Sequence, residues 1–216
     1  MPPRKLEKST ENQRRRPQQA RARQKVDAVL DACTQVLARH GYHGTTVLEL
    51  SLESGVAVPT LYQYFSSKEA IFVAWVERSI DQVLEQVVKA QQADAKATLE
   101  GYIDALVQVA LASVSLLRPA LRSLLAEMPQ MLSSQVMMTM EVRTVAMVEC
   151  QFADQIRALP ADRVRFHLQM LVRMIAGYFL LTILQGTRTL DVERESSEIA
   201  GMVKAYLLRA NLIAAG

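Results

Sequence analysis

Residues that interrupt helices are scarce in this sequence, which has eight glycines and seven prolines among 216 residues. Their scarcity favours long uninterrupted elements, most simply helices. Cysteine is scarcer still: Cys33 and Cys150 lie far apart, each in a helix-like apolar pattern. Two such residues do not make a disulfide scaffold, and we therefore expect a reduced, cytoplasmic protein.

Several recognisable segments are also missing. No stretch reaches 18 uninterrupted apolar residues, and no apolar segment follows the basic N-terminus, so we expect neither a membrane span nor a signal peptide. The sequence has no glycine-rich phosphate loop, no His/Cys cluster with metal-ligand spacing and no nucleophile elbow. We therefore expect a protein that is not an enzyme, with no metal, no cofactor and no membrane partner.

What is present is an asymmetry of charge. Residues 1–25 hold nine lysines and arginines against Glu7 and Glu11, whereas the remainder holds 16 basic and 20 acidic residues. A basic segment on a mildly acidic body suggests a polyanionic partner at one end of the chain. The alternative is a solvated tail that only aids solubility. The body itself has the composition of a globular protein, since half of all residues are hydrophobic.

The N-terminal third is predicted to form an arm followed by helices. Residues 1–19 are polar and lack apolar periodicity, which predicts a flexible basic arm. Apolar residues then recur at helical spacing, so we expect a first helix from about Arg21 to His40, ended by Gly41. A second helix follows Thr45 or Thr46, and Glu49 stands where it would complete a capping box with Thr46.

Gly55 ends the second helix after about two turns, and Pro59 suits the first turn of a third helix from about Val58 to Tyr64. Ser66 or Ser67 would cap a fourth helix that continues towards Ala90. The rest of the chain is predicted to be helical too, over about 98–117, 120–127, 132–158, 161–186 and 192–214. Prolines 119, 129 and 160 mark three of the expected ends.

We therefore predict an all-α protein. It would combine an N-terminal three-helix helix-turn-helix domain with a C-terminal helical domain. The expected divisions are the arm at 1–19, the helix-turn-helix domain at 20–67, a connecting helix at 68–94, and the C-terminal domain at 95–216.

Two short helices joined at a glycine turn can place the second helix in the major groove of DNA. The residues at this point resemble the TetR family of bacterial regulators, over about residues 22–75. The resemblance rests on Gly41, Thr46, Leu50, Ser51, the run Ser54-Gly55-Val56, the run Pro59-Thr60-Leu61-Tyr62-Gln63-Tyr64-Phe65, Lys68 and Glu69.

The resemblance implies a role for each matching position. Thr45, Thr46, Tyr62, Tyr64 and Lys68 would contact backbone phosphates and the walls of the groove. The base readers would be Val58, Pro59, Thr60 and Gln63. Leu61 and Phe65 are instead expected in the core, which is also an alternative for Tyr64, and Thr60 could be only a helix hydroxyl.

Two positions depart from the family pattern. Ala57 stands where the family often has Ser, which removes a capping hydroxyl, and Pro59 stands where Gly is common. Both leave the operator sequence open. In the basic arm, Arg14, Arg15, Arg16, Arg21 and Arg23 would follow phosphates or enter the minor groove.

The resemblance also implies a homodimer, built from the last two helices of each subunit as a four-helix bundle. Leu171, Ile175 and Tyr178 recur on one of these helices, and Met202, Val203 and Tyr206 recur on the other. These six residues are the predicted dimer interface. The alternative is that they form the core of the monomer.

A methionine-rich stretch suggests a pocket for a largely apolar ligand, although methionines that simply fill the core are the alternative. Arg143 and Arg173 would be ion-pair partners or would bind an anionic ligand head. The predicted ligand-binding residues are Tyr102, Leu106, Met137, Met140, Met147, Gln151 and Met170.

These features together predict a transcriptional regulator, most simply a repressor that leaves a double-stranded, palindromic DNA operator when a small molecule binds the C-terminal domain. The alternative is a DNA-binding regulator or architectural module that has no small-molecule inducer.

Overall fold

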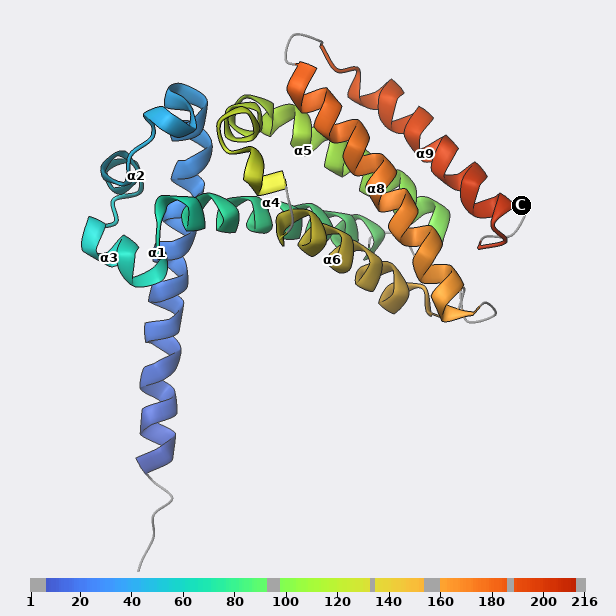
Figure 1. The fold of residues 1–216 in the computed structure, drawn as a ribbon. Helices are drawn as coiled ribbons and strands as arrows, with labels where there is room; N and C mark the ends of the chain where they lie inside the picture. The colour runs from blue at the N-terminus through green and yellow to red at the C-terminus, as the bar shows by residue number, and fades with distance from the viewer. Residues whose placement is uncertain (1–6, 93–97, 133–134, 154–159, 186–188, 213–216) are drawn as a thin grey trace, which may run out of the picture. The chain divides into compact units, whose positions relative to one another are not determined.

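The computed structural model describes residues 7–92, 98–132, 135–153, 160–185 and 189–212. All regular structure in these ranges is helical, which confirms the predicted fold class (Figure 1). The elements are α1 (Glu7–Gly44), α2 (Val47–Ser54), α3 (Val58–Tyr64), α4 (Lys68–Gln92), α5 (Leu99–Glu127), the 3₁₀ helix η1 (Pro129–Leu132), α6 (Gln135–Gln151), α8 (Ala161–Gln185) and α9 (Val192–Arg209).

The chain divides into two compact units, Met1–Trp75 and Val76–Gly216. The division falls inside α4, so this helix belongs to both units. In the N-terminal unit, α1 presents a buried face at helical spacing to residues from α2, α3 and the start of α4. Trp75 also donates a hydrogen bond from Nε1 to Thr34 Oγ1, at 3.1 Å. The buried residues include Val29, Cys33, Val36, Leu37, Leu50, Leu61, Phe72 and Trp75.

Helix α1 corrects one prediction and confirms another. It begins at Glu7 and not near Arg21, so residues 7–19 lie in a helix although they lack an apolar face. Glu, Gln, Arg and Lys are good helix formers, and their propensity left no sign in the apolar periodicity. Gly41 has φ 68° and ψ 178°, which breaks the helical path there, as predicted. This conformation is essentially restricted to glycine.

In the C-terminal unit, α5 packs against both α8 and α9, and α6 packs against α8 (Figure 1). Burial of their facing apolar stripes stabilises this unit, at about 25 cal/mol for each Å² removed from water. The core cluster includes Leu99, Tyr102, Val107, Val145, Phe152, Leu168, Leu171, Ile199, Val203 and Leu207.

Helix α5 corrects a predicted boundary, because it continues through Pro119 to Glu127. Proline removes one helical hydrogen bond, but apolar residues on both sides, such as Leu111 and Leu124, are fully buried and hold the helix in place. The helices predicted at 98–117 and 120–127 are therefore one helix. The predicted helix at 132–158 is η1 followed by α6, with residues 154–158 outside the described part of the chain.

Two helices, α5 and α8, are long and apolar enough on average to cross a membrane by composition alone, which no 18-residue apolar run had indicated. This is weak evidence, because the core helices of soluble proteins pass the same test. Both helices contribute to the core cluster described above, as a helical domain requires.

Candidate functional site

The second helix of the N-terminal unit begins with the predicted capping box. Thr46 Oγ1 accepts a hydrogen bond from the Glu49 amide at 3.1 Å, and the Glu49 carboxylate accepts one from the Thr46 amide at 2.7 Å. The Thr46 amide and the Thr46 hydroxyl both donate to this carboxylate, which lowers the pKa of Glu49 below its usual value. The two bonds from amides satisfy donors that a helix start otherwise leaves without partners, and so fix where α2 begins.

The turn between α2 and α3 depends on Gly55, which has φ 69° and ψ 12°. This left-handed conformation suits glycine, and a side chain there would be strained. Helix α3 then starts at Val58 with Pro59 in its first turn. Its N-cap residue, Ala57, makes no side-chain hydrogen bond to the helix, as its departure from the family pattern predicted.

Helix α3 has a buried side and an exposed side. Leu61 and Phe65 are buried, which confirms that they belong to the core. Tyr62 is 56% exposed and Tyr64 is 39% exposed, so the ring of Tyr64 is not a core group. Gln63, Pro59 and Thr46 are exposed, and Val58 and Thr60 are half-buried. Seven predicted DNA-binding residues therefore remain accessible on this surface.

The remaining two predicted contacts already have partners within the protein. Thr45 is only 1% exposed, and its hydroxyl donates to the Gly41 carbonyl at 2.6 Å. Lys68 donates from Nζ to the carbonyls of Tyr42 and Thr45, at 2.9 and 3.1 Å. The same ammonium lies 4.1 Å from the centre of the Tyr42 ring, within reach of a cation–π contact. Lys68 thus ties α4 to the turn at the end of α1, and its contact with a phosphate stays a prediction.

Tyr42 completes this tie. Its hydroxyl donates to the Glu69 carboxylate at 2.5 Å. Burial and the neighbouring Glu69 raise the pKa of Tyr42 to about 12, and the hydrogen bond from Tyr42 lowers the pKa of Glu69. The sequence reasoning missed Tyr42, although its position directly after a helix-ending glycine was a usable signal.

Two of the five arginines predicted to bind DNA from the basic arm can be placed on the surface of the structure. Arg21 and Arg23 are exposed on α1, whereas the side chains of Arg14, Arg15 and Arg16 lie outside the described part of the chain. Arg39 is held by an ion pair with Glu53 at 2.9 Å, which connects α1 to α2.

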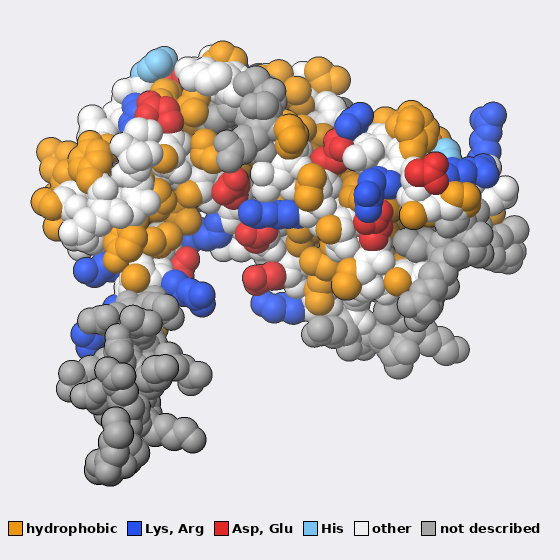
Figure 2. Space-filling view, turned by 60° about the horizontal axis from the view of Figure 1, so that its bottom comes forward, with side chains coloured by type: hydrophobic (Ala, Val, Ile, Leu, Met, Phe, Trp, Pro, Cys, Tyr) orange, Lys and Arg blue, Asp and Glu red, His pale blue; other side chains and the backbone are white. Residues whose placement is uncertain are grey.

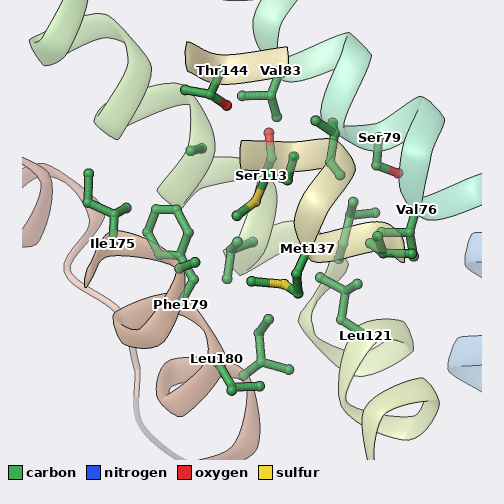
Figure 3. Close-up of a pocket in the computed structure, with 18 of the residues that line it drawn as sticks. Val76, Ser79, Val83, Ser113, Leu121, Met137, Thr144, Ile175, Phe179 and Leu180 are labelled. Atoms are coloured by element: carbon green, nitrogen blue, oxygen red, sulfur yellow. The ribbon is translucent and has the colours of Figure 1, made fainter. Parts of the chain in front are cut away.

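The C-terminal unit contains a cavity of about 230 Å³ between α4, α5, α6 and α8 (Figure 3). Apolar side chains make up nearly all of its wall, and the hydroxyl groups are those of Ser79, Ser113 and Thr144. Representative apolar residues are Val83, Leu106, Leu121, Met137, Met140, Ile175, Phe179 and Leu180.

Comparison with known proteins shows which proteins the N-terminal unit is similar to. The family described as "Bacterial regulatory proteins, tetR family" matches residues 29–75. The fatty acid metabolism regulator protein of Bacillus subtilis is 34% identical over 65 residues, which are 30% of this chain and 34% of that protein. The transcriptional repressor ComR of Escherichia coli is 40% identical over 65 residues, which are 29% and 31% of the two chains.

Over residues 29–75, the N-terminal unit is therefore similar to the TetR family of bacterial regulatory proteins. The chain matches about a third of the length of these curated relatives. The fold likeness extends further: the crystal structure of FadR from Bacillus subtilis in complex with stearoyl-CoA has a TM-score of 0.59 at 18% identity, covering 82% of this chain and 96% of that one. At this identity, the likeness shows the fold of the C-terminal unit and no more.

Three of the predicted ligand-binding residues, Leu106, Met137 and Met140, line the cavity. The other four do not. Tyr102 is fully buried in the core against Phe152, and burial raises its pKa to about 12. Met147 packs on the same core, Gln151 is exposed, and Met170 accepts a hydrogen bond from Tyr206. The sequence missed the hydroxyl groups, because serine and threonine carry no apolar signal.

The predicted dimer interface is largely the core of the monomer. Leu171 and Val203 are buried in the core cluster, Ile175 lines the cavity, and the Tyr178 hydroxyl donates to Glu195. The Tyr206 hydroxyl forms a hydrogen bond with His167 Nδ1, at 2.7 Å. Met202, which is 65% exposed, is the one predicted interface residue that faces outward among the six.

A different stripe of α8 is apolar and exposed. Phe166, Met170, Met174, Gly177, Leu181 and Leu184 follow one another at intervals of three or four residues, which places them on one face of the helix. On α9, Gly201, Met202 and Leu208 are exposed. A Cβ atom added at Gly177 or Gly201 would meet nothing within 4 Å. We call these residues the α8–α9 face.

The charged side chains of the C-terminal unit are paired between helices. Arg143 binds Asp81 at 2.6 Å, and Arg173 binds both oxygens of Glu141, at 2.7 and 3.0 Å. Figure 2 shows acidic and basic side chains next to one another at several places on one face of the molecule. Among the described residues, no group of three His, Cys, Asp or Glu side chains could hold a metal ion.

Proposed function

We propose that this chain is a DNA-binding transcriptional regulator that acts in the cytoplasm as a ligand-relieved repressor of a palindromic operator. The observation that carries the proposal is helix α3. It is anchored by Leu61 and Phe65 and leaves Tyr62, Gln63 and Tyr64 exposed on the opposite side. A helix that is anchored on one side and exposed on the other can lie in the major groove of DNA.

The residues divide into two roles on this proposal. Thr46, Tyr62 and Tyr64 contact phosphates, and Arg21 and Arg23 add attraction that falls as salt rises. Val58, Pro59, Thr60 and Gln63 face base edges. The names of two relatives, a fatty acid metabolism regulator and a transcriptional repressor, support a regulatory role.

The test begins with selection of bound DNA from a random pool by the full-length protein. Tyr62→Ala should weaken binding to the selected sequence and to random DNA by similar factors, because phosphate contacts carry no sequence information. Gln63→Ala should change the selected sequence at one position, whereas Gln108→Ala, an exposed glutamine on α5, should change nothing. If Gln63→Ala and Gln108→Ala both select the parent sequence, the proposed docking of α3 is wrong.

The proposal includes a homodimer formed through the α8–α9 face. Exposed large apolar side chains at helical spacing, together with glycines that nothing covers in one subunit, suit a helix bundle with close approach between subunits. Met174→Glu, at a position 59% exposed on this face, should yield a monomer in analytical ultracentrifugation. Met138→Glu, at an exposed position on α6, is the matched control and should remain a dimer. A dimeric Met174→Glu protein would contradict this interface.

Release from DNA requires the effector to bind one state of the protein better than the other. A shift from 1:99 to 99:1 needs about 5.5 kcal/mol of difference in binding free energy. We propose that the cavity of the C-terminal unit is the effector site. A regulator without an inducer would instead keep its operator affinity in the presence of every compound that binds this cavity.

A further inference from the structure

The wall of the cavity carries no charge. Every lining residue has an apolar side chain or a hydroxyl group. A second hollow shares Met137, Met140, Val172 and Ala176 with the cavity and is bordered by Arg173, but that guanidinium is already bound to both oxygens of Glu141. An ionised group placed in such surroundings would lose its hydration without gaining a partner. The cavity therefore disfavours carboxylates, phosphates and ammonium groups.

Among the described residues, two hydroxyl groups of this wall make no hydrogen bond, those of Ser113 on α5 and Thr144 on α6. Ser79 is engaged in another interaction. In the view of Figure 3, Ser113 and Thr144 lie on the same side of the cavity as Val83, with Leu121 and Leu180 across from them. A hydroxyl in apolar surroundings is stabilised by any ligand atom that bonds to it.

The cavity has room for a chain of several carbon atoms. One water requires about 10–15 Å³ of this kind of volume, so a cavity of about 230 Å³ accommodates a molecule of eight carbon atoms.

We infer that the cavity binds an uncharged, medium-sized, mostly hydrocarbon molecule with a single oxygen function, an alcohol or a ketone, whose oxygen bonds to Ser113 and Thr144. This inference rests on the proposed function, since it names the class of the effector. The two hydroxyl groups select the oxygen function, and the uncharged wall excludes acids and amines of the same length.

The test uses the full-length protein without DNA and five eight-carbon probes: 1-octanol, 2-octanone, octanoate, octylammonium and octane. Isothermal titration calorimetry should give saturable binding of 1-octanol and 2-octanone. Octane, delivered from saturated vapour in a thermal-shift assay, should bind about threefold to tenfold more weakly, which is the contribution of one hydrogen bond. Octanoate and octylammonium should give no binding at the same concentrations.

Matched variants locate the site. Ser113→Ala and Thr144→Val should each reduce the preference for 1-octanol over octane, while Ser115→Ala and Thr182→Val, hydroxyl losses outside the cavity wall, should leave it unchanged. Ala110→Leu should fill part of the cavity and weaken all neutral probes together. Ala112→Leu, exposed on the same helix, should not.

Octanoate binding that equals 1-octanol binding would overturn the inference, since it would place a charged head at Arg173. An unchanged octanol preference in both Ser113→Ala and Thr144→Val would overturn it as well. Octanol that binds the cavity but leaves operator affinity unchanged supports the inference and contradicts ligand-relieved repression. A protein that binds its operator but none of the neutral probes overturns the inference and leaves the proposed DNA-binding function in place.

Discussion

The helices of the N-terminal unit and those of the C-terminal unit are positioned by different interactions. The N-terminal unit uses its polar groups: the capping box of α2, the tie from Lys68 to two carbonyls, and the Tyr42–Glu69 bond all fix short elements at defined angles. The C-terminal unit also pairs charges between its helices, but these long helices pack mainly through apolar stripes, and its cavity is lined almost entirely by hydrocarbon. Directional bonds suit a surface that must match a rigid partner, whereas apolar packing leaves room for a pocket that adapts.

This contrast predicts that the two units lose function separately. Leu61→Ala removes a fully buried side chain that anchors α3, and it should cost about 2–5 kcal/mol of stability in the N-terminal unit. Urea unfolding should show the loss, and operator binding should fall with it, while 1-octanol binding is retained. Leu52→Ala, at an exposed leucine on α2, is the control. Loss of both activities in Leu61→Ala would show that the units unfold as one.

The tie from Lys68 should have the next largest effect. Lys68→Met leaves the Tyr42 and Thr45 carbonyls without their charged donor and should cost about 1.5–3 kcal/mol in urea unfolding. Lys89→Met, an exposed lysine on the same helix, should be nearly neutral. If Lys68 is instead a phosphate anchor, stability will be unchanged, and the salt dependence of operator binding will fall by about one counterion.

Helix capping allows a direct comparison of the two units. Thr46 and Thr98 both accept a bond from the amide three residues later, but only Thr46 has a reciprocal carboxylate, that of Glu49. Thr46→Ala should cost about 1 kcal/mol, and Thr98→Ala should cost less. Thermal unfolding of the two variants, followed by circular dichroism, measures the difference. Equal losses would mean that the Glu49 bond adds nothing.

The smallest expected effect is a loss of stability that begins only at alkaline pH. The pKa of Tyr42 is raised from 10 to about 12, so the folded state keeps the proton that the unfolded state loses. Stability from this group is therefore complete below pH 10 and is lost as the pH rises towards 12. Ultraviolet titration of the parent should show late titration of both Tyr42 and Tyr102, and Tyr42→Phe should show one late-titrating tyrosine fewer. If Tyr42→Phe instead loses a tyrosine that titrates near pH 10, the Tyr42–Glu69 bond is contradicted.

The sequence predicted the N-terminal unit well because its signals are local. Gly41, the Thr46–Glu49 pair, Gly55 and Pro59 each act within four residues of their own position, and the structure places all of them as expected. The structural contacts of Lys68 were not predicted, because its two carbonyl partners lie 26 and 23 residues earlier in the chain. An ammonium that bonds to distant main-chain groups leaves no pattern in the sequence.

The C-terminal unit was harder for a different reason. Helix α8 is apolar on more than one side: Leu168 and Leu171 face the core, and Met170 and Met174 are exposed. Hydrophobic periodicity cannot separate two apolar stripes on one helix, so the predicted dimer residues fell on the inner one. The cavity brings four helices together from residues 76 to 183, and only the folded chain shows which of their residues meet.

Pro119 gives this cavity a particular property. It lies in α5 between two groups of lining residues, with Ser113, Val114 and Leu117 before it and Leu121, Leu124 and Leu125 after it. Proline has no amide hydrogen to offer the carbonyl of Ser115, so this turn is held by one backbone bond fewer than its neighbours. The wall is therefore two stiff segments joined at a softer point. A homologous series of longer alcohols would be accommodated first by flexing of this joint, with both packed ends of the helix left in place.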